Sequence, residues 1–334
     1  MHLQVMHISS NARRVGHMKA LVTGGAGFIG SYLVEALLGR SQAVWVLDDL
    51  SSGSKKNLQR VSDSPRLEFV KGDCRDTITV RTLLKRTDVV FHFAANPEVR
   101  IELVDPKECY ARNIEATFAL LEQLKTSKAE AIVFASSSTV YGDARQIPTP
   151  EDYGPLLPIS VYGASKLACE AMISSYCSSF NKKGIILRLA NILGTGSQHG
   201  VVFDFRKKLK KNPYKLQILG DGKQAKSYLH IDDCIDAILK ASDSLTKGGA
   251  AIYNIGSADM ITVDEIAKVV VKVQKLKDVE FEFTGGVDGG RGWIGDVKTM
   301  LLDIRKIKAL GWKPKLNSKQ AVQKLVHELK SLED

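Results

Sequence analysis

A glycine-rich turn between a short apolar run and a helical pattern restricts what the N-terminal part of this chain can form. The turn, Thr23–Gly30 (TGGAGFIG), directly follows the apolar run Ala20–Val22, and Leu33 and Leu37 recur after it at helical spacing. Strand, glycine turn and helix in this order are typical of a dinucleotide-binding unit, because glycines let the backbone approach a pyrophosphate at the positive end of the helix. The alternative interpretation is a tight turn that binds no cofactor.

An acidic residue follows the next apolar run at the distance that such a unit requires. The run Ala43–Leu47 predicts a second strand, and it ends at Asp48, eighteen residues after Gly30. A carboxylate at this position binds ribose hydroxyls in dinucleotide-binding folds. Because the same charge would repel a 2′-phosphate, the sequence predicts NAD rather than NADP.

Alternating strand and helix patterns define the fold class. Further predicted strands are Leu67–Val70, Val89–Ala95, Ala131–Phe134 and Gly184–Leu187, with helical patterns between them. This alternation predicts an α/β fold with a doubly wound (Rossmann) parallel sheet. A chain of 334 residues is long enough for a second, smaller α/β lobe that binds substrate. We expect residues 18–190, with 225–255 returning, to form the NAD-binding domain, and residues 191–224 and 256–334 to form the second one.

The composition indicates which binding partners and which cellular compartment to expect for this protein. The five cysteines are scattered and form no Cys-x-x-Cys pair, which favours a reducing cytoplasm and argues against a disulfide framework or a metal site. No apolar run reaches the roughly 18 residues of a membrane span. The net charge is +10, but its densest run, Arg206–Lys211, is typical of the solvated face of an amphipathic helix, so no nucleic-acid partner is predicted. Residues 1–17 lack a secretory signal pattern and are expected to be a disordered or non-native tail.

A tyrosine and a lysine one helical turn apart are candidates for catalysis. Tyr162 and Lys166 are four residues apart and would share a helix face. A nearby ammonium group favours the phenolate, so Lys166 is expected to lower the pKa of Tyr162 from about 10 toward neutrality. The phenolate could then take a proton from a sugar hydroxyl. Alone, this spacing is more typical of a solvated helix face, but the glycine turn and the serine run Ser136–Ser138, after a predicted strand, favour the catalytic interpretation.

Together these motifs resemble the extended short-chain dehydrogenase/reductases, within their NAD-dependent sugar-nucleotide epimerase/dehydratase group, and most of all the UDP-hexose 4-epimerases. The resemblance runs from Met18 to the end and includes Tyr228–Asp233 and Leu310–Trp312. It implies an enzyme that inverts C4 of a UDP-hexose (UDP-glucose/UDP-galactose) through a transient 4-keto sugar. It also implies a cytoplasmic homodimer, formed through the helical segments 113–124 and 162–180.

The resemblance implies a role for each matching residue. Ser137, Tyr162 and Lys166 would be catalytic, with Ser137 holding the reacting oxygen against Tyr162. Tightly bound NAD would contact Gly24, Gly27, Phe28, Ile29, Gly30, Asp48, Asp49, Ser52, Gly53, Asp73, Cys74, Phe93, Ala94, Ala95, Asn113, Ser136, Tyr162, Lys166 and Leu189. The UDP-sugar would contact Ser137, Tyr162, Asn191, Val201, Gln217, Leu219, Lys226, Arg291 and Met300.

Two substitutions relative to the family pattern bear on the reaction and on the nucleotide site. Sugar-nucleotide 4,6-dehydratases carry an acidic pair directly after the residue that matches Ser137, whereas this chain has Ser138 and Thr139, which favours epimerisation. Arg291 lies four residues before Gly295 rather than in the family's usual arginine position, which Trp293 occupies. Open alternatives are an epimerase for N-acetylated or uronic sugars, a reductase or dehydratase, and a non-catalytic NAD-binding regulator. His92, after a predicted buried strand, is interpreted as a structural histidine.

Overall fold

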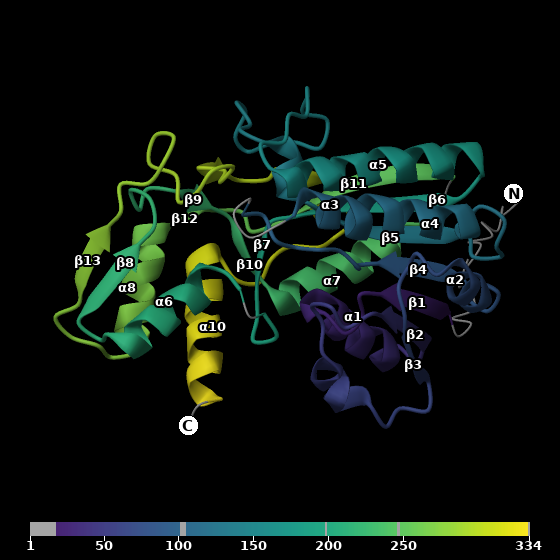
Figure 1. The fold of residues 1–334 in the computed structure, drawn as a ribbon, viewed down its shortest axis with the longest axis horizontal. Coiled ribbons are helices and arrows are strands. Elements are labelled where there is room, and N and C mark those ends of the chain that lie inside the picture. Colours follow the sequence, from purple (N-terminus) through teal and green to yellow (C-terminus); the bar gives the residue numbers. More distant parts are fainter. Residues whose placement is uncertain (1–17, 101–104, 198, 246–247, 333–334) are drawn as a thin grey trace, which may run out of the picture.

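A seven-stranded parallel sheet forms the centre of the larger lobe (Figure 1). The computed structural model describes residues 18–100, 105–197, 199–245 and 248–332, so the predicted tail lies outside the described residues. The strand order is β11-β6-β5-β4-β1-β2-β3. Its strands are β1 (Lys19–Thr23), β2 (Ala43–Asp48), β3 (Leu67–Lys71), β4 (Val89–His92), β5 (Ala131–Ser137), β6 (Lys183–Leu189) and β11 (Gly249–Ile255). The predicted fold class is confirmed.

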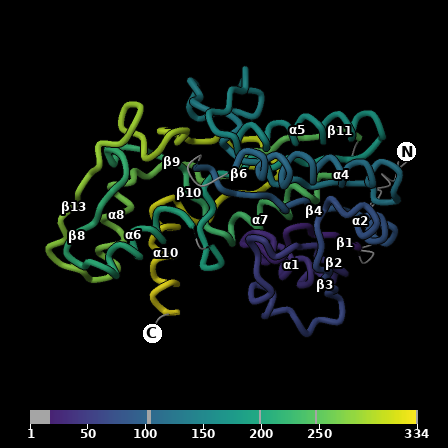
Figure 2. The backbone as a smooth tube through the Cα atoms, viewed as in Figure 1, coloured from purple at the N-terminus to yellow at the C-terminus, as the bar shows by residue number. Residues whose placement is uncertain are grey.

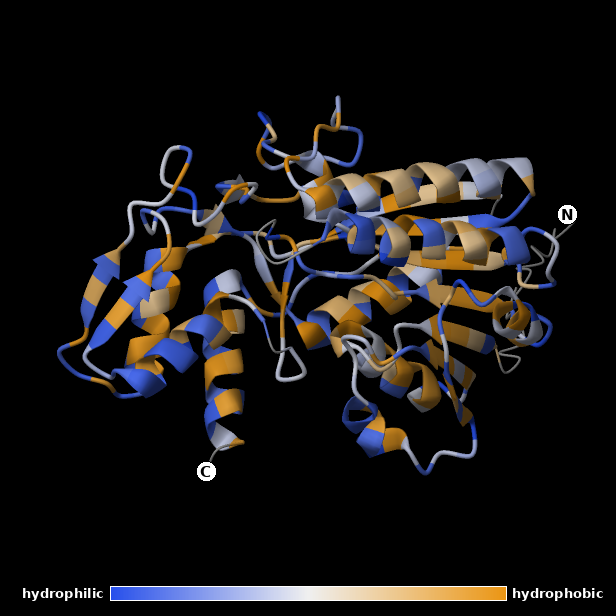
Figure 3. Ribbon diagram, viewed as in Figure 1, coloured by the Kyte–Doolittle hydropathy of each residue, from blue (hydrophilic) through white to orange (hydrophobic). Residues whose placement is uncertain are grey.

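The strand order reverses at β1, which lies between β2 and β4: β2 and β3 follow on one side of it, and β4, β5 and β6 on the other. In doubly wound sheets a crevice opens at this point, beyond the carboxyl ends of the strands. The strands read as continuous apolar runs because helices cover both faces of the sheet, as Figure 3 shows by their orange colour.

Helices on the two faces bury separate apolar clusters. On one face, α1 (Phe28–Gly39) and α7 (Ile231–Ser242) contribute Leu33, Leu37 and Ile238. On the other face, α2 (Thr77–Leu84), α4 (Ala116–Leu124) and α5 (Val161–Ser179) contribute Leu120 and Ile173. Shorter elements are η1 (Lys55–Val61), α3 (Pro106–Cys109), the π-helical η3 (Tyr110–Glu115), η4 (Ser138–Tyr141) and α9 (Arg305–Lys308).

The smaller lobe has its own apolar cluster beside the sheet domain (Figures 1 and 2). It contains α6 (Val201–Lys211), α8 (Val263–Val273), α10 (Ser318–Ser331), β8 (Lys215–Ile218) and β13 (Glu280–Phe283). Short strands lie between the lobes: β7 (Asn191–Leu193) pairs with β10 (Tyr228–His230), and β9 (Ala225–Lys226) pairs with β12 (Ile261–Thr262) and β14 (Thr299–Met300). The exact domain boundaries stay a prediction.

The basic run on α6 lies as the sequence predicts. On α6, Val202, Phe205 and Leu209 are buried while Lys207 and Lys211 are exposed, so the basic run is the solvated face of an amphipathic helix. All five cysteines are free and buried. In the described ranges, every helix is too short or too polar to cross a membrane.

His92 is a buried structural histidine, as predicted. It is fully buried at the end of β4, and its two ring nitrogens contact the hydroxyl oxygens of Thr23 and Thr117 at 2.7 and 2.9 Å. Burial, with a smaller contribution from the charge of Lys166, lowers the pKa of His92 to about 3.

The lowered pKa of His92 predicts that the folded protein loses stability in acid. Between pH 6.5 and 3 the unfolded chain binds one proton more at His92 than the folded chain does, so stability falls as the pH drops through this window. Over that range the wild-type free energy of unfolding should fall by about 1.4 kcal/mol per pH unit more steeply than that of His92→Gln. Urea unfolding of both proteins at several pH values measures the two slopes, and equal slopes would contradict the assignment.

Candidate active site

The glycine turn packs so closely that side chains would not fit. Gly24 has a φ of +69°, and a Cβ there would lie 2.5 Å from the backbone nitrogen of Ala94. A Cβ on Gly30 would lie 2.1 Å from the carbonyl oxygen of Gly24. Gly27 precedes α1 without a side-chain cap, so the N–H groups of the first turn face the end of the sheet. This is the cradle that a pyrophosphate requires.

A hollow of about 550 Å³ opens beside this turn, at the carboxyl edge of the sheet. Four of its lining residues are charged: Asp48, Asp49, Asp73 and Arg112. Ten residues of the predicted NAD set line it, namely Gly24, Gly27, Asp48, Asp49, Ser52, Asp73, Cys74, Phe93, Ala94 and Ala95. Leu47, Ser51, Gly72, Arg112 and Ala116 complete the lining. A neutral adenosine fits the acidic hollow and a pyrophosphate fits the turn, so the residues present fit NAD.

Asp48 joins the two loops that border the hollow. Its carboxylate accepts hydrogen bonds from the backbone N–H groups of Ala26 at 2.9 Å and of Leu50 at 2.8 Å. Burial raises its pKa, and these hydrogen bonds oppose the rise. The residue therefore fixes the glycine turn against the end of β2, and its predicted contact with ribose would use the remaining lone pairs.

The candidate catalytic hydroxyls meet beyond the end of β5. The Ser160 hydroxyl accepts from the Gly163 N–H at 3.0 Å and starts α5, which places Tyr162 in the first turn. Ser137, the last residue of β5, lies near enough to the Tyr162 hydroxyl to lower the pKa of that phenol. The Ser137 hydroxyl also accepts from the Thr139 hydroxyl at 2.9 Å. The predicted proximity of Ser137 and Tyr162 is therefore present in the fold.

The expected effect of Lys166 on Tyr162 is wrong for this structure. Burial raises the pKa of Tyr162, and the nearby Ser137 hydroxyl opposes that rise. Lys166 is 3% exposed, and its ammonium donates to the Ala135 carbonyl at 2.8 Å and lies 5.8 Å from the Tyr162 ring centroid. Burial lowers its own pKa to about 8. The sequence predicts the shared helix face, but burial of both groups is the largest influence on each pKa.

A buried ion pair lies beneath these residues. Arg188 of β6 and Glu170, one turn after Lys166 on α5, are 2.7 Å apart, with side chains 2% and 5% exposed. The Ser136 hydroxyl donates to Glu170 at 2.5 Å. Ser136, predicted to contact NAD, therefore turns into this network and is not part of the lining of the hollow.

A π-helical turn directs two neighbouring residues to different places. Asn113, in η3, accepts from the Asn96 N–H at 2.7 Å and donates to the Ser165 hydroxyl at 2.8 Å. It therefore ties the loop after β4 to α5. Arg112 instead reaches the hollow. Such wide turns often occur at functional sites.

Sequence comparison explains this combination of glycine turn, hollow and tyrosine–lysine helix. The family model described as "NAD dependent epimerase/dehydratase family" matches residues 20–256. The chain belongs to this family. Proteins similar to this chain include enzymes named as epimerases and enzymes named as dehydratases.

Two curated relatives illustrate them. The UDP-glucose 4-epimerase of Mycolicibacterium smegmatis is 32% identical over 316 residues, covering 92% of this chain and 97% of the relative. The dTDP-D-glucose 4,6-dehydratase of Homo sapiens is 30% identical over 320 residues, covering 92% and 89%.

Solved structures of the family share the fold. A UDP-galactose 4-epimerase has a TM-score of 0.83 at 39% identity, covering 94% of this chain and 99% of its own. A UDP-glucuronic acid 4-epimerase variant from Bacillus cereus, crystallised with a fluorinated UDP-glucuronic acid and NAD, has a TM-score of 0.85 at 29% identity, covering 94% and 100%. A UDP-N-acetylglucosamine 4-epimerase from Methanobrevibacter ruminantium has a TM-score of 0.82 at 27% identity, covering 94% and 99%.

The residues predicted to contact the UDP-sugar come mostly from the smaller lobe and from the short strands between the lobes. Asn191 begins β7, Val201 begins α6, Gln217 lies in β8 with Leu219 following it, and Lys226 and Met300 end β9 and β14. Lys226 pairs with Asp296 at 2.5 Å, and Arg291 pairs with Asp143 at 2.9 Å. The Arg291 guanidinium also donates to the carbonyl of Asp296 at 2.5 Å, so the two cations meet at this residue.

Trp293 completes this group. Its ring centroid lies 5.4 Å from the Lys226 ammonium, and its indole N–H is buried without a hydrogen-bond partner in the described part of the chain. A bound ligand could accept from this N–H, since buried donors are normally paired.

Sequence reasoning missed Arg112, Asp143, Asp296 and the Glu170–Arg188 pair. Asp143 directly follows the Tyr141-Gly142 segment and Asp296 directly follows Gly295. Both lie next to residues that belong to the sequence motifs, and this proximity in sequence could have identified them as site residues. The spacing of Glu170 four residues after Lys166 could have placed it on the catalytic face of α5. For Arg112, the sequence contains no comparable signal.

Proposed function

We propose that this protein is a UDP-hexose 4-epimerase that interconverts UDP-glucose and UDP-galactose. The observation that carries the proposal is the proximity of Ser137, at the end of β5, to Tyr162, in the first turn of α5, with hydroxyl side chains at positions 138 and 139. The similarity to two proteins named as UDP-glucose and UDP-galactose 4-epimerases supports it.

The chain's own residues supply proton transfer and orientation. Tyr162 is the proposed group that takes the proton of the sugar 4-hydroxyl and later returns it, a role that requires its pKa to fall below the raised value that burial gives it here. Ser137 would hold the reacting oxygen by a hydrogen bond. Lys166, with a pKa of about 8, is protonated at neutral pH and can donate to the nicotinamide ribose. NAD, when bound, supplies the hydride acceptor and donor for inversion at C4. Because the hydride returns to the same sugar, NAD stays with the protein as a retained cofactor.

A 4,6-dehydratase is the second candidate, favoured by the similarity to the human dehydratase. Elimination of water needs an additional acid and base. Ser138 and Thr139 cannot serve as that pair, and the Thr139 hydroxyl already donates to Ser137. This arrangement supports epimerisation over dehydration.

Incubation with a panel of UDP-glucose, UDP-galactose, UDP-N-acetylglucosamine, UDP-glucuronic acid and dTDP-glucose tests the proposal. We expect UDP-glucose and UDP-galactose to interconvert without net NADH formation, with products resolved by chromatography. A keto-deoxy product from dTDP-glucose would contradict the proposal in favour of the dehydratase. Conversion of uronic or N-acetylated sugars alone would contradict the assigned specificity.

Met300 is the proposed wall beside the C2 substituent of the sugar. It is 8% exposed and aligns with Lys226 in the β14–β9 pair. Methionine can vacate volume by changing rotamer, so partial acceptance of N-acetylhexosamines is expected, with plain hexoses preferred. Met300→Tyr should abolish N-acetyl activity and spare UDP-glucose. Thr299→Tyr, at the exposed neighbouring position, is the control; an unchanged N-acetyl to hexose ratio in Met300→Tyr would show that Met300 is not the gate.

The homodimer and the cytoplasmic location are further proposals that rest on resemblance. On the face formed by α4 and α5, Phe118 is 47% exposed, and Phe180, directly after α5, is 44% exposed. The ring of Tyr176 contacts both, at centroid distances of 6.5 and 5.3 Å. Clustered exposed aromatic side chains of this kind are typical of protein–protein contact surfaces.

A further inference from the structure

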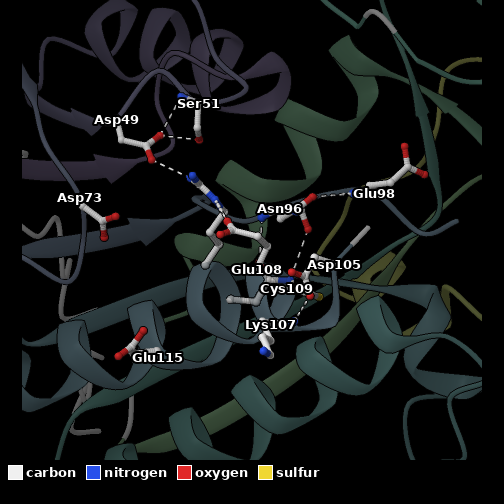
Figure 4. Close-up of polar contacts among 12 residues, drawn as sticks. Asp49, Ser51, Asp73, Asn96, Glu98, Asp105, Lys107, Glu108, Cys109 and Glu115 are labelled. Carbon is white, nitrogen blue, oxygen red and sulfur yellow. Dashed lines mark hydrogen bonds and ion pairs between the residues drawn. The ribbon is translucent and has the colours of Figure 1, made fainter. Parts of the chain in front are cut away.

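Arg112 lies between two carboxylates at the hollow in which the adenosine part of NAD would bind. Its guanidinium donates to the Asp49 carboxylate at 2.8 Å and to that of Glu108, one turn earlier, also at 2.8 Å. In Figure 4, dashed lines lead from Asp49 toward the helical segment that carries Glu108. Two carboxylates therefore fix the guanidinium in one orientation.

The pair of Arg112 and Asp49 joins two segments that line the hollow. Asp49 belongs to the loop after β2, whereas Arg112 belongs to η3, and both line the hollow. The side chains are 31% and 32% exposed, so the pair lies at the rim rather than at the floor.

Arg112 also supplies the positive charge in the lining of the hollow. Among the charged residues of the lining, Arg112 is the single cation beside Asp48, Asp49 and Asp73. The Ser51 hydrogen bonds and the Arg112 guanidinium outweigh burial and hold the pKa of Asp49 below its usual range, so its carboxylate is charged at neutral pH. Arg112 also lowers the pKa of Asp73, although Arg75 contributes more. The guanidinium thus balances an otherwise acidic hollow, and its flat group is suited to stack on an aromatic base.

We propose that Arg112 is a cofactor-retaining residue whose ion pair with Asp49 closes the adenosine end of the NAD site. The π-helical turn that contains both Arg112 and Asn113 makes this arrangement possible, because it directs Asn113 inward and Arg112 across the hollow. The proposal rests on the NAD dependence of the family and not on the sugar that the protein converts. It can therefore fail while the proposed epimerase activity stands, and the reverse also holds.

Release of bound NADH tests the proposal without any sugar substrate. The protein is loaded with NADH, excess NAD is added, and the fall in the fluorescence of bound NADH gives the release rate. Arg112→Gln should release NADH about tenfold faster than wild type, since a partly buried ion pair and a stacking contact are lost together. Asp49→Asn should also accelerate release, and the double variant should release NADH no faster than Arg112→Gln alone, because the two residues act as one pair.

Salt and a matched control separate the pair from a general charge effect. Raising the ionic strength from about 0.05 to 0.5 M should accelerate release from the wild type and change it little in Arg112→Gln. Arg81→Gln removes a cation on α2 that donates to the Gln123 side chain at 3.0 Å and is not part of the lining. Its release rate should stay within twofold of wild type.

Three results would overturn the proposal: release from Arg112→Gln at the wild-type rate, equal acceleration in Arg81→Gln, or additive effects of Asp49→Asn and Arg112→Gln. If Arg112→Gln fails to fold, Arg112→Lys provides the test. It keeps the charge but loses the two-pronged guanidinium contact, so it should still release NADH faster than wild type. Release at the wild-type rate from Arg112→Lys would then overturn the proposal.

Discussion

Tyr162→Phe should retain the fold and bound NAD but lose about 100-fold or more in turnover. The substitution removes the hydroxyl near Ser137, which is the group proposed to exchange a proton with the sugar. The aromatic ring remains, so the packing of the first turn of α5 should not change. Steady-state kinetics with UDP-galactose, together with the NAD content of the purified protein, measure both parts of the expectation.

Another tyrosine provides the control for this experiment. The Tyr153 hydroxyl accepts from the Arg145 N–H at 3.1 Å in the loop that precedes α5. Tyr153→Phe removes a phenolic hydroxyl without touching Ser137 or Lys166, and should turn over at close to the wild-type rate. Wild-type turnover in Tyr162→Phe would exclude Tyr162 as the proton-transferring group.

Glu170→Leu should reduce the free energy of unfolding by about 3–5 kcal/mol. The reason is that Arg188, with a side chain 2% exposed, would keep its charge in the interior without a partner. Arg188 still donates to the Glu151 carbonyl at 3.0 Å, but one neutral acceptor does not replace a bidentate carboxylate. Urea unfolding at pH 7, followed by circular dichroism, measures the loss.

A double variant and a surface variant sharpen this test. Glu170→Leu/Arg188→Met removes both charges, so most of the lost stability should return. Glu130→Gln breaks a pair with Lys183 in which the Glu130 side chain is 74% exposed, and it should cost no more than about 1 kcal/mol. A loss below about 1 kcal/mol in Glu170→Leu would show that the buried pair is not a major source of stability.

Local patterns predicted the features that depend on a few neighbouring residues. The solvated face of α6 and the buried environment of His92 are both present. Each depends on burial of apolar residues at a fixed period or on contacts within one turn, which the order of residues specifies. The pKa of Tyr162 was predicted in the wrong direction, because spacing does not reveal how deeply a helix face is buried.

The sequence by itself determined the strand–turn–helix unit, the parallel sheet and the placement of Ser137 and Tyr162 at its carboxyl edge. Glycine sterics, hydrophobic period and the right-handed connection of parallel strands leave few alternatives for such a pattern. Tertiary structure decided which charges meet: Asp49 and Arg112 are 63 positions apart, and Asp143 and Arg291 are 148 positions apart. Pairs so distant along the chain form only when the packing of whole elements brings them together. For Arg112, the π-helical turn η3 also determines where its side chain lies. Those contacts therefore become visible only in the folded protein.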